Sequence, residues 1–127
     1  MAFEITEKFL ENLSKLIDSK DDRAIASLFE EVHYADIAEV LDEVNFEDAI
    51  YIIKLLDSEK TSEILMELDE DIREKILENL SAKEIAEEVE EMDSDDAADI
   101  IGELSEERQK RVISALEDDD LAADIKE

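Results

Sequence analysis

The chain of 127 residues has no cysteine, no proline, one glycine and one histidine. Without cysteine it has no disulfide framework and no thiolate metal site, and a single histidine does not make a zinc site. Nucleophilic catalysis of the Ser–His–carboxylate kind has no evident constellation here, and the lone glycine, Gly102, cannot form a phosphate-binding loop. We therefore expect a protein that is not an enzyme, with no catalytic and no organic cofactor-binding residues.

Basic residues and long apolar runs are also scarce. There are 13 Lys and Arg residues against 41 Asp and Glu residues, so the formal net charge is −28. Nucleic acids and anionic membrane surfaces require basic patches, which this sequence lacks. The longest apolar run, Ala49 to Ile53, is far shorter than the roughly 20 residues of a membrane span. We expect no nucleic-acid partner and no membrane insertion by this segment, and cations or basic proteins are the favoured partners.

What the sequence does contain is a repeat of twelve residues from His33 onward. The last position of each block is apolar in all seven complete blocks: Val44, Leu56, Leu68, Leu80, Met92, Leu104 and Leu116. The position three residues earlier is also apolar throughout, and the one before it is apolar in every block except at Glu88. Within a block these positions form one helical stripe. An eighth block begins at Glu117.

The first position of each block predicts where a helix starts. It holds the strong N-cap residues Asn45, Asp57, Asp69, Ser81, Asp93 and Ser105. Ser81 and Glu84 have the spacing of a capping box. His33 also stands at a first position, and we interpret it as a helix-start residue that contacts the local backbone.

A period of twelve excludes one continuous helix and a coiled coil. Because an α-helix turns about 100° per residue, twelve residues rotate the stripe by roughly 120° beyond three full turns. Short helices must therefore break at each cap and stack as a solenoid. We predict an all-α single domain over residues 1–127, a superhelical stack of either hand with about nine short helices: two lead helices in residues 1–32 and single-helix repeats in residues 33–127.

Acidic residues crowd one stretch, from Glu84 to Asp99, where nine of sixteen residues are acidic. For any single member, a solvated helix face or a cap is the favoured interpretation. Asp95 and Asp99, however, are four residues apart and lie on one face of the predicted helix, where like charges cost stability unless a cation is near. Carboxylate oxygens suit Mg²⁺ or Ca²⁺. Asp95 and Asp99 are thus the candidate metal ligands, and a second protein surface would have to complete their half-built site.

Two segments resemble a known family. Residues 33–41, HYADIAEVL, and residues 93–104, DSDDAADIIGEL, are similar to motifs of the cytoplasmic N-terminal domain of the MgtE magnesium transporter-channels, and the repeats keep register over essentially the whole chain. The family often has proline at the second position of a block, where this chain has Tyr34, Phe46, Ser58, Ala82 and Ser94. Proline at the first position of a helix only makes the helix start more rigid, so its absence weakens the corners between helices but remains compatible with the fold.

The resemblance implies a function. It implies a Mg²⁺-sensing regulatory domain in a homodimeric transporter at the cytoplasmic face of the bacterial inner membrane, where weakly bound Mg²⁺ bridges this domain to acidic CBS domains of the same polypeptide and favours the closed channel. Asp95 and Asp99 match the family's ion-binding positions, and Asp93 and Asp96 would be caps or outer-shell groups. The chain would then be a fragment of a longer protein.

Other functions stay open at the level of the sequence. The repeats also resemble those of the flagellar motor switch protein, so the fold is equally compatible with a solenoid that binds a partner protein without sensing a metal. The net charge alone is compatible with an acidic mimic of nucleic acid, a third and weaker alternative.

Overall fold

The structure, a computed structural model, describes residues 3–116, and this part of the chain contains nine α-helices and no strand. The prediction of an all-α fold of about nine short helices is therefore confirmed. The helices are α1 (Glu7–Asp18), α2 (Asp22–Phe29), α3 (Tyr34–Glu43), α4 (Phe46–Leu55), α5 (Ser58–Glu67), α6 (Glu70–Glu78), α7 (Ala82–Glu90), α8 (Ser94–Gly102) and α9 (Glu106–Ala115). None of these nine helices of residues 3–116 has both the length and the apolar character needed to cross a bilayer. The eighth sequence block, from Glu117 on, lies outside the described residues.

The helices start where the twelve-residue pattern predicts. Every first position from His33 to Ser105 is an N-cap with extended backbone, and five of the seven side chains accept a hydrogen bond from the first turn of their helix. Asp69 and Asp93 stand at the cap position without a side-chain cap bond. The predicted capping box of Ser81 and Glu84 is present. Within the described chain only Lys20 has a positive φ, so extended caps make the corners between repeats without glycine or proline.

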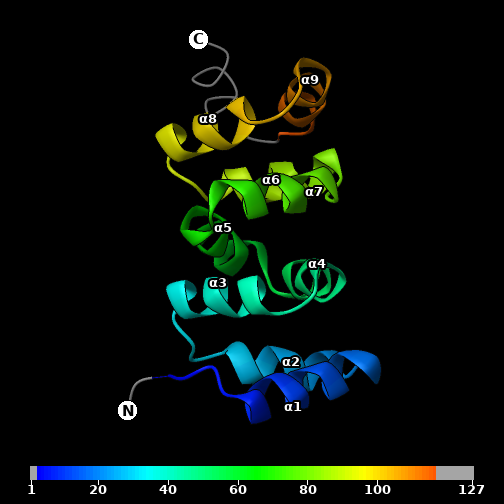
Figure 1. Ribbon diagram of the computed structural model, residues 1–127. Helices are drawn as coiled ribbons and strands as arrows, with labels where there is room; N and C mark the ends of the chain where they lie inside the picture. Colours follow the sequence, from blue (N-terminus) through cyan, green and yellow to red (C-terminus); the bar gives the residue numbers. More distant parts are fainter. Residues whose placement is uncertain (1–2, 117–127) are drawn as a thin grey trace.

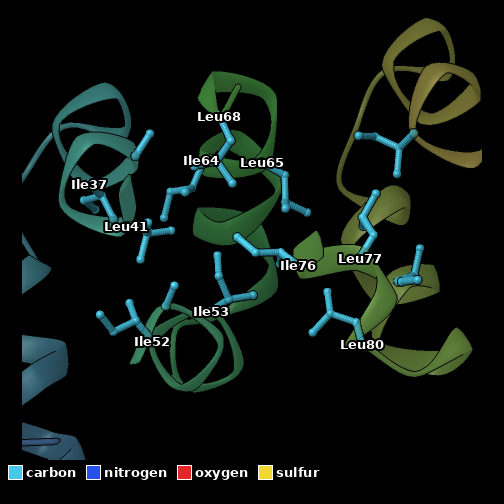
Figure 2. Close-up of a cluster of buried hydrophobic side chains, with 14 of the residues drawn as sticks. Ile37, Leu41, Ile52, Ile53, Ile64, Leu65, Leu68, Ile76, Leu77 and Leu80 are labelled. Atoms are coloured by element: carbon cyan, nitrogen blue, oxygen red, sulfur yellow. The ribbon is translucent and has the colours of Figure 1, made fainter. Parts of the chain in front are cut away.

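The apolar stripe forms the core. The position four residues before the end of each block is buried in all seven blocks, and the position after it is buried in six, Ile113 being partly exposed. Figure 2 shows how residues of four successive repeats face one another, with Ile37 and Leu41 of α3 opposite Ile64 of α5, and Ile53 of α4 close to Ile76 of α6. The buried apolar residues form one cluster that extends from Leu13 to Leu116.

The helices stack into an elongated ladder with α1 and α2 at one end and α9 at the other (Figure 1). Each odd-numbered helix from α3 packs on the next odd-numbered one, so that α3, α5, α7 and α9 form a central row. The even-numbered α4 and α8 lie beside this row against their neighbours in sequence, and α4 also contacts α1 and α2. Small residues at the sixth block position, Ala38, Ser62 and Ala86, are buried in α3, α5 and α7 and allow these helices to approach closely. The boundaries thus repeat every twelve residues, whereas the packing repeats every twenty-four.

Three of the scarce basic side chains bridge helices by donating to main-chain carbonyl oxygens at the end of another helix. Lys60 Nζ donates to the oxygens of Phe29 and Glu30 at the end of α2, at 2.7 and 3.1 Å. Arg108 donates to the oxygens of Leu77 and Leu80 at the end of α6, at 3.0 and 2.6 Å. The third is Arg73, which donates to the oxygen of Leu68 after α5, at 3.2 Å. A cation at a helix C-terminus also opposes the helix dipole. The contacts of Lys60 and Arg108 join helices about thirty residues apart in sequence, whereas the contact of Arg73 joins successive helices.

Candidate functional site

The two predicted metal ligands lie on the solvent side of α8. Ala97, Ile100 and Ile101 are buried and hold this helix against the core. Asp95 and Asp99 are exposed, and Asp96, between them in sequence, is partly buried. At a spacing of four residues on a helix, the β-carbons of two side chains are about 6 Å apart. Both carboxylates are therefore available to a ligand from outside the chain.

The equivalent positions of α9 show that side chains at this register can meet. Asp95 and Asp99 are the third and seventh residues of their block, and the corresponding residues of the next block are Glu107 and Arg111. In α9 these two form an exposed ion pair, with Arg111 Nη2 at 2.7 Å from Glu107 Oε1. In α8 the base is replaced by a second acid, so a cation between Asp95 and Asp99 would occupy the place that the guanidinium takes in α9.

The two aspartates differ in their electrostatic surroundings. Arg73 of α6 forms a bidentate ion pair with Glu103, the C-cap residue that follows α8, with the shortest N–O distance at 2.7 Å and both side chains mostly buried. The hydrogen bonds that Arg73 donates to Glu103 are the main cause that raises the pKa of the Arg73 guanidinium, and the fields of Glu103, Glu70 and Asp99 add to it, against the effect of burial. Asp99 therefore lies within the field of a fixed cation, whereas Asp95 lies in the first turn of its helix.

Asp95 and Asp99 are not joined by a third ligand from the described part of the chain. Within residues 3–116, no group of three or more His, Asp or Glu side chains is arranged to hold a metal ion. Asp93, predicted as a cap or an outer-shell group, occupies the N-cap position of α8, but its side chain accepts no cap hydrogen bond. The donor set is thus two exposed carboxylates, which suits a hard cation that keeps several of its waters.

The acidic stretch from Glu84 to Asp99 separates into groups with different surroundings. Glu84 completes the capping box of α7 and lies 3.7 Å from Lys54 Nζ. Glu88 departs from the general expectation of a solvated face, because its side chain is buried in the core and only 7% exposed. Burial is the main cause that raises its pKa to about 7. His33, the lone histidine, caps α3 as predicted: its Nδ1 accepts a hydrogen bond of 3.1 Å from the Ala35 amide.

Sequence reasoning missed the roles of Arg73 and Glu88, although the aligned blocks contain a signal for each. Arg73 is the fifth residue of its block, where the other six blocks have Ile, Ala, Thr or Gln. Glu88 is the eighth residue of its block, where the other six have Val or Ile. A charged residue at a position that is otherwise uncharged indicates a partner elsewhere in the fold, since a charge is buried only when it is paired or neutralised.

A family model matches most of the chain, and two solved structures have a similar fold. Residues 32–127 match the model of the MgtE intracellular N domain. The fold is similar to the crystal structure of the soluble part of a magnesium transporter, with a TM-score of 0.79 and 18% identity over 94% of this chain and 47% of that one. It is also similar to the cytosolic domain of the Mg²⁺ channel MgtE in complex with ATP, with a TM-score of 0.77 and 26% identity over 92% of this chain and 48% of that one.

The chain spans about half the length of each of these two structures. No curated protein sequence matches it. The family model covers most of the chain, including the helical repeats from α3 to α9. On this evidence the chain belongs to the family of MgtE intracellular N domains.

Proposed function

We propose that this chain is a cytoplasmic Mg²⁺-sensing regulatory domain of a magnesium transporter or channel. In this proposal it is part of a homodimeric integral membrane protein of the bacterial inner membrane. Mg²⁺ bridges the domain to acidic CBS domains of the same polypeptide and thereby favours the closed channel. The two structural relatives, which come from a magnesium transporter and from the Mg²⁺ channel MgtE, support the transport context.

The observation that carries the proposal is the pair of exposed carboxylates, Asp95 and Asp99, at a register where α9 holds an acid–base pair. Each carboxylate would supply oxygen to a Mg²⁺ ion that keeps most of its water shell. Because residues 3–116 supply only these two ligands, affinity would depend on oxygens from the facing surface. If the site is complete only when the two acidic surfaces meet, Mg²⁺ binds the closed arrangement more tightly than the open one. This difference in affinity is what shifts the equilibrium toward closure.

The net charge of −28 supports the same proposal. Two acidic surfaces repel each other at low ion concentration and approach when divalent cations screen and bridge them. The resulting element has two arrangements, and the Mg²⁺ concentration sets the balance between them.

The test is to replace both ligands and to compare the result with a matched control. In the transporter that carries this domain, we expect D95N/D99N to shift channel closure to higher Mg²⁺ concentrations. The control is E59Q/E63Q, because Glu59 and Glu63 of α5 are also exposed and occupy the same third and seventh block positions. It removes the same two charges but not the proposed ligands. If the two double variants shift the Mg²⁺ concentration of channel closure equally, the shift results from the lower net charge. A specific site at Asp95 and Asp99 would then be excluded.

A second candidate function is a helical-repeat module that binds a partner protein without sensing a metal. The same experiment distinguishes the two candidates. If the channel with D95N/D99N closes at the same Mg²⁺ concentrations as the wild type, Asp95 and Asp99 do not sense Mg²⁺. A protein-binding role then replaces the proposed one.

A further inference from the structure

Glu88 is placed in the core by the repeat itself. It is the eighth residue of its block and belongs to α7, and the residues at this position in the other six blocks are Val or Ile and are all buried. Glu88 is only 7% exposed. Its carboxyl therefore replaces an aliphatic side chain at the contact between α7 and α5, the preceding helix of the central row.

The partner of this carboxyl is Thr61 of α5, which is fully buried. The Thr61 hydroxyl is hydrogen-bonded to Glu88 Oε2, and its Oγ1 also lies 3.1 Å from the carbonyl oxygen of Asp57. A threonine hydroxyl has one proton and can also accept. If Glu88 is protonated, it donates to Thr61, and Thr61 donates to Asp57, so both protons have an acceptor. If Glu88 is ionised, Thr61 must turn its only proton to the carboxylate and leaves the bond to Asp57.

Among the described residues, the charged groups that act on Glu88 include no base that would compensate its ionised carboxylate. The charged groups that act on its carboxyl are Glu87 and Glu84 on its own helix and Asp57 at the N-cap of α5, all of them acids. Within the described residues, none of those groups comes from α8 or α9, which also pack on α7. Burial, more than these acids, raises the pKa of Glu88 to about 7, and the hydrogen bond from Thr61 opposes the rise. Ionisation thus occurs near neutral pH and places an unpaired charge between two helices.

Of the three contacts within the central row, the one between α5 and α7 is the least extensive; the contacts of α3 with α5 and of α7 with α9 are larger. We propose that Glu88 and Thr61 form a proton-controlled joint between the two halves of the stack: neutral Glu88 holds α7 against α5, and ionised Glu88 loosens this contact. The joint lies between α1–α5 and α8, the helix that carries Asp95 and Asp99, so its state affects how α8 is presented. It does not depend on Mg²⁺ sensing by this domain.

The absence of cysteine makes a direct test possible. Cysteines introduced at Glu43 of α3 and Lys110 of α9, both exposed, carry spin labels on either side of the joint. Double electron–electron resonance at pH 6 and pH 8.5, which measures the distance between the two spin labels, should show a shifted or broadened distance distribution at the higher pH. We expect the same change in E63Q, which removes an exposed acid of α5 that is not among the groups acting on Glu88, and none in E88Q, which keeps a hydrogen-bonding side chain but cannot ionise.

The titration of Glu88 is measured separately in the unaltered chain, by the carboxyl carbon resonance in NMR. A midpoint near 7 supports the joint, and a midpoint near the ordinary 4.5 overturns it. A distance distribution that does not change with pH in the wild type, or that changes equally in E88Q, also overturns it. Because the NMR measurement needs no substitution at Glu88, the proposal stays falsifiable even if E88Q fails to fold.

Discussion

Replacing Glu88 by glutamine should stabilise the protein at alkaline pH, although most substitutions in a core are destabilising. Glutamine is nearly isosteric with protonated glutamate and can keep the hydrogen bond to Thr61, but it never carries the charge. The wild-type carboxyl has a pKa of about 7 in the folded state against an ordinary value of 4.5. The folded state therefore binds more protons than the unfolded state between these two pH values.

The sign and the size of the effect follow from that difference. Stability from the neutral carboxyl is fully present below about pH 4.5 and is lost as the pH rises to about 7, with little change beyond. At about 1.4 kcal/mol for each pH unit, a difference of roughly 2.5 units corresponds to about 3 kcal/mol. Relaxation of the core around the charge reduces this, so we expect E88Q to exceed the wild type by about 2 to 3 kcal/mol at pH 8 and by little at pH 4.5.

Urea unfolding at pH 4.5, 6 and 8 measures the difference. The chain has 41 acidic residues, so its own stability varies with pH for many reasons, but those contributions are common to both proteins and cancel when the two are compared. E63Q is the control: Glu63 is exposed on α5 and is not among the acids that act on Glu88, so its loss should change stability by no more than about 0.5 kcal/mol at any of the three pH values. A difference between E88Q and wild type that is flat with pH, or a less stable E88Q at pH 8, would refute the reasoning.

Two further substitutions test the other structural assignments. R73M removes the guanidinium that binds Glu103 and the carbonyl of Leu68, and it leaves a mostly buried carboxylate unpaired. It should therefore lower the free energy of unfolding in urea by about 2 to 3 kcal/mol. R111M breaks only the exposed pair with Glu107 and should lower it by less than about 1 kcal/mol. Equal losses in the two variants would show that Arg73 does not link the helices. G102A should stabilise by about 0.5 to 1 kcal/mol, because Gly102 lies in the last turn of α8 with no positive φ and no atom within 4 Å of an added β-carbon. A lower melting temperature for G102A would mean that this glycine has a conformational role that its backbone does not indicate.

The helix boundaries and the buried stripe could be predicted from the residues alone, because both depend on interactions within a few residues. Caps such as Asn45 and Asp57 bind amides three residues away, and the apolar positions recur within one helix. The exposed positions of Asp95 and Asp99 agree with the same local pattern, since the stripe of α8 determines which face is buried. Their role as Mg²⁺ ligands remains a prediction, because it depends on a second surface.

Only the tertiary structure decided which helices pair and which charged residues are buried. Ala86 and Ala98 are the same residue at the same sixth position of successive blocks, yet Ala86 is buried between helices of the central row and Ala98 is exposed on α8. Glu88 and Arg73 meet partners 27 and 30 residues away in sequence. The physical reason is that a twelve-residue block determines its own helix, whereas the alternation of helices between the central row and its side arises from packing between blocks, which local periodicity does not encode.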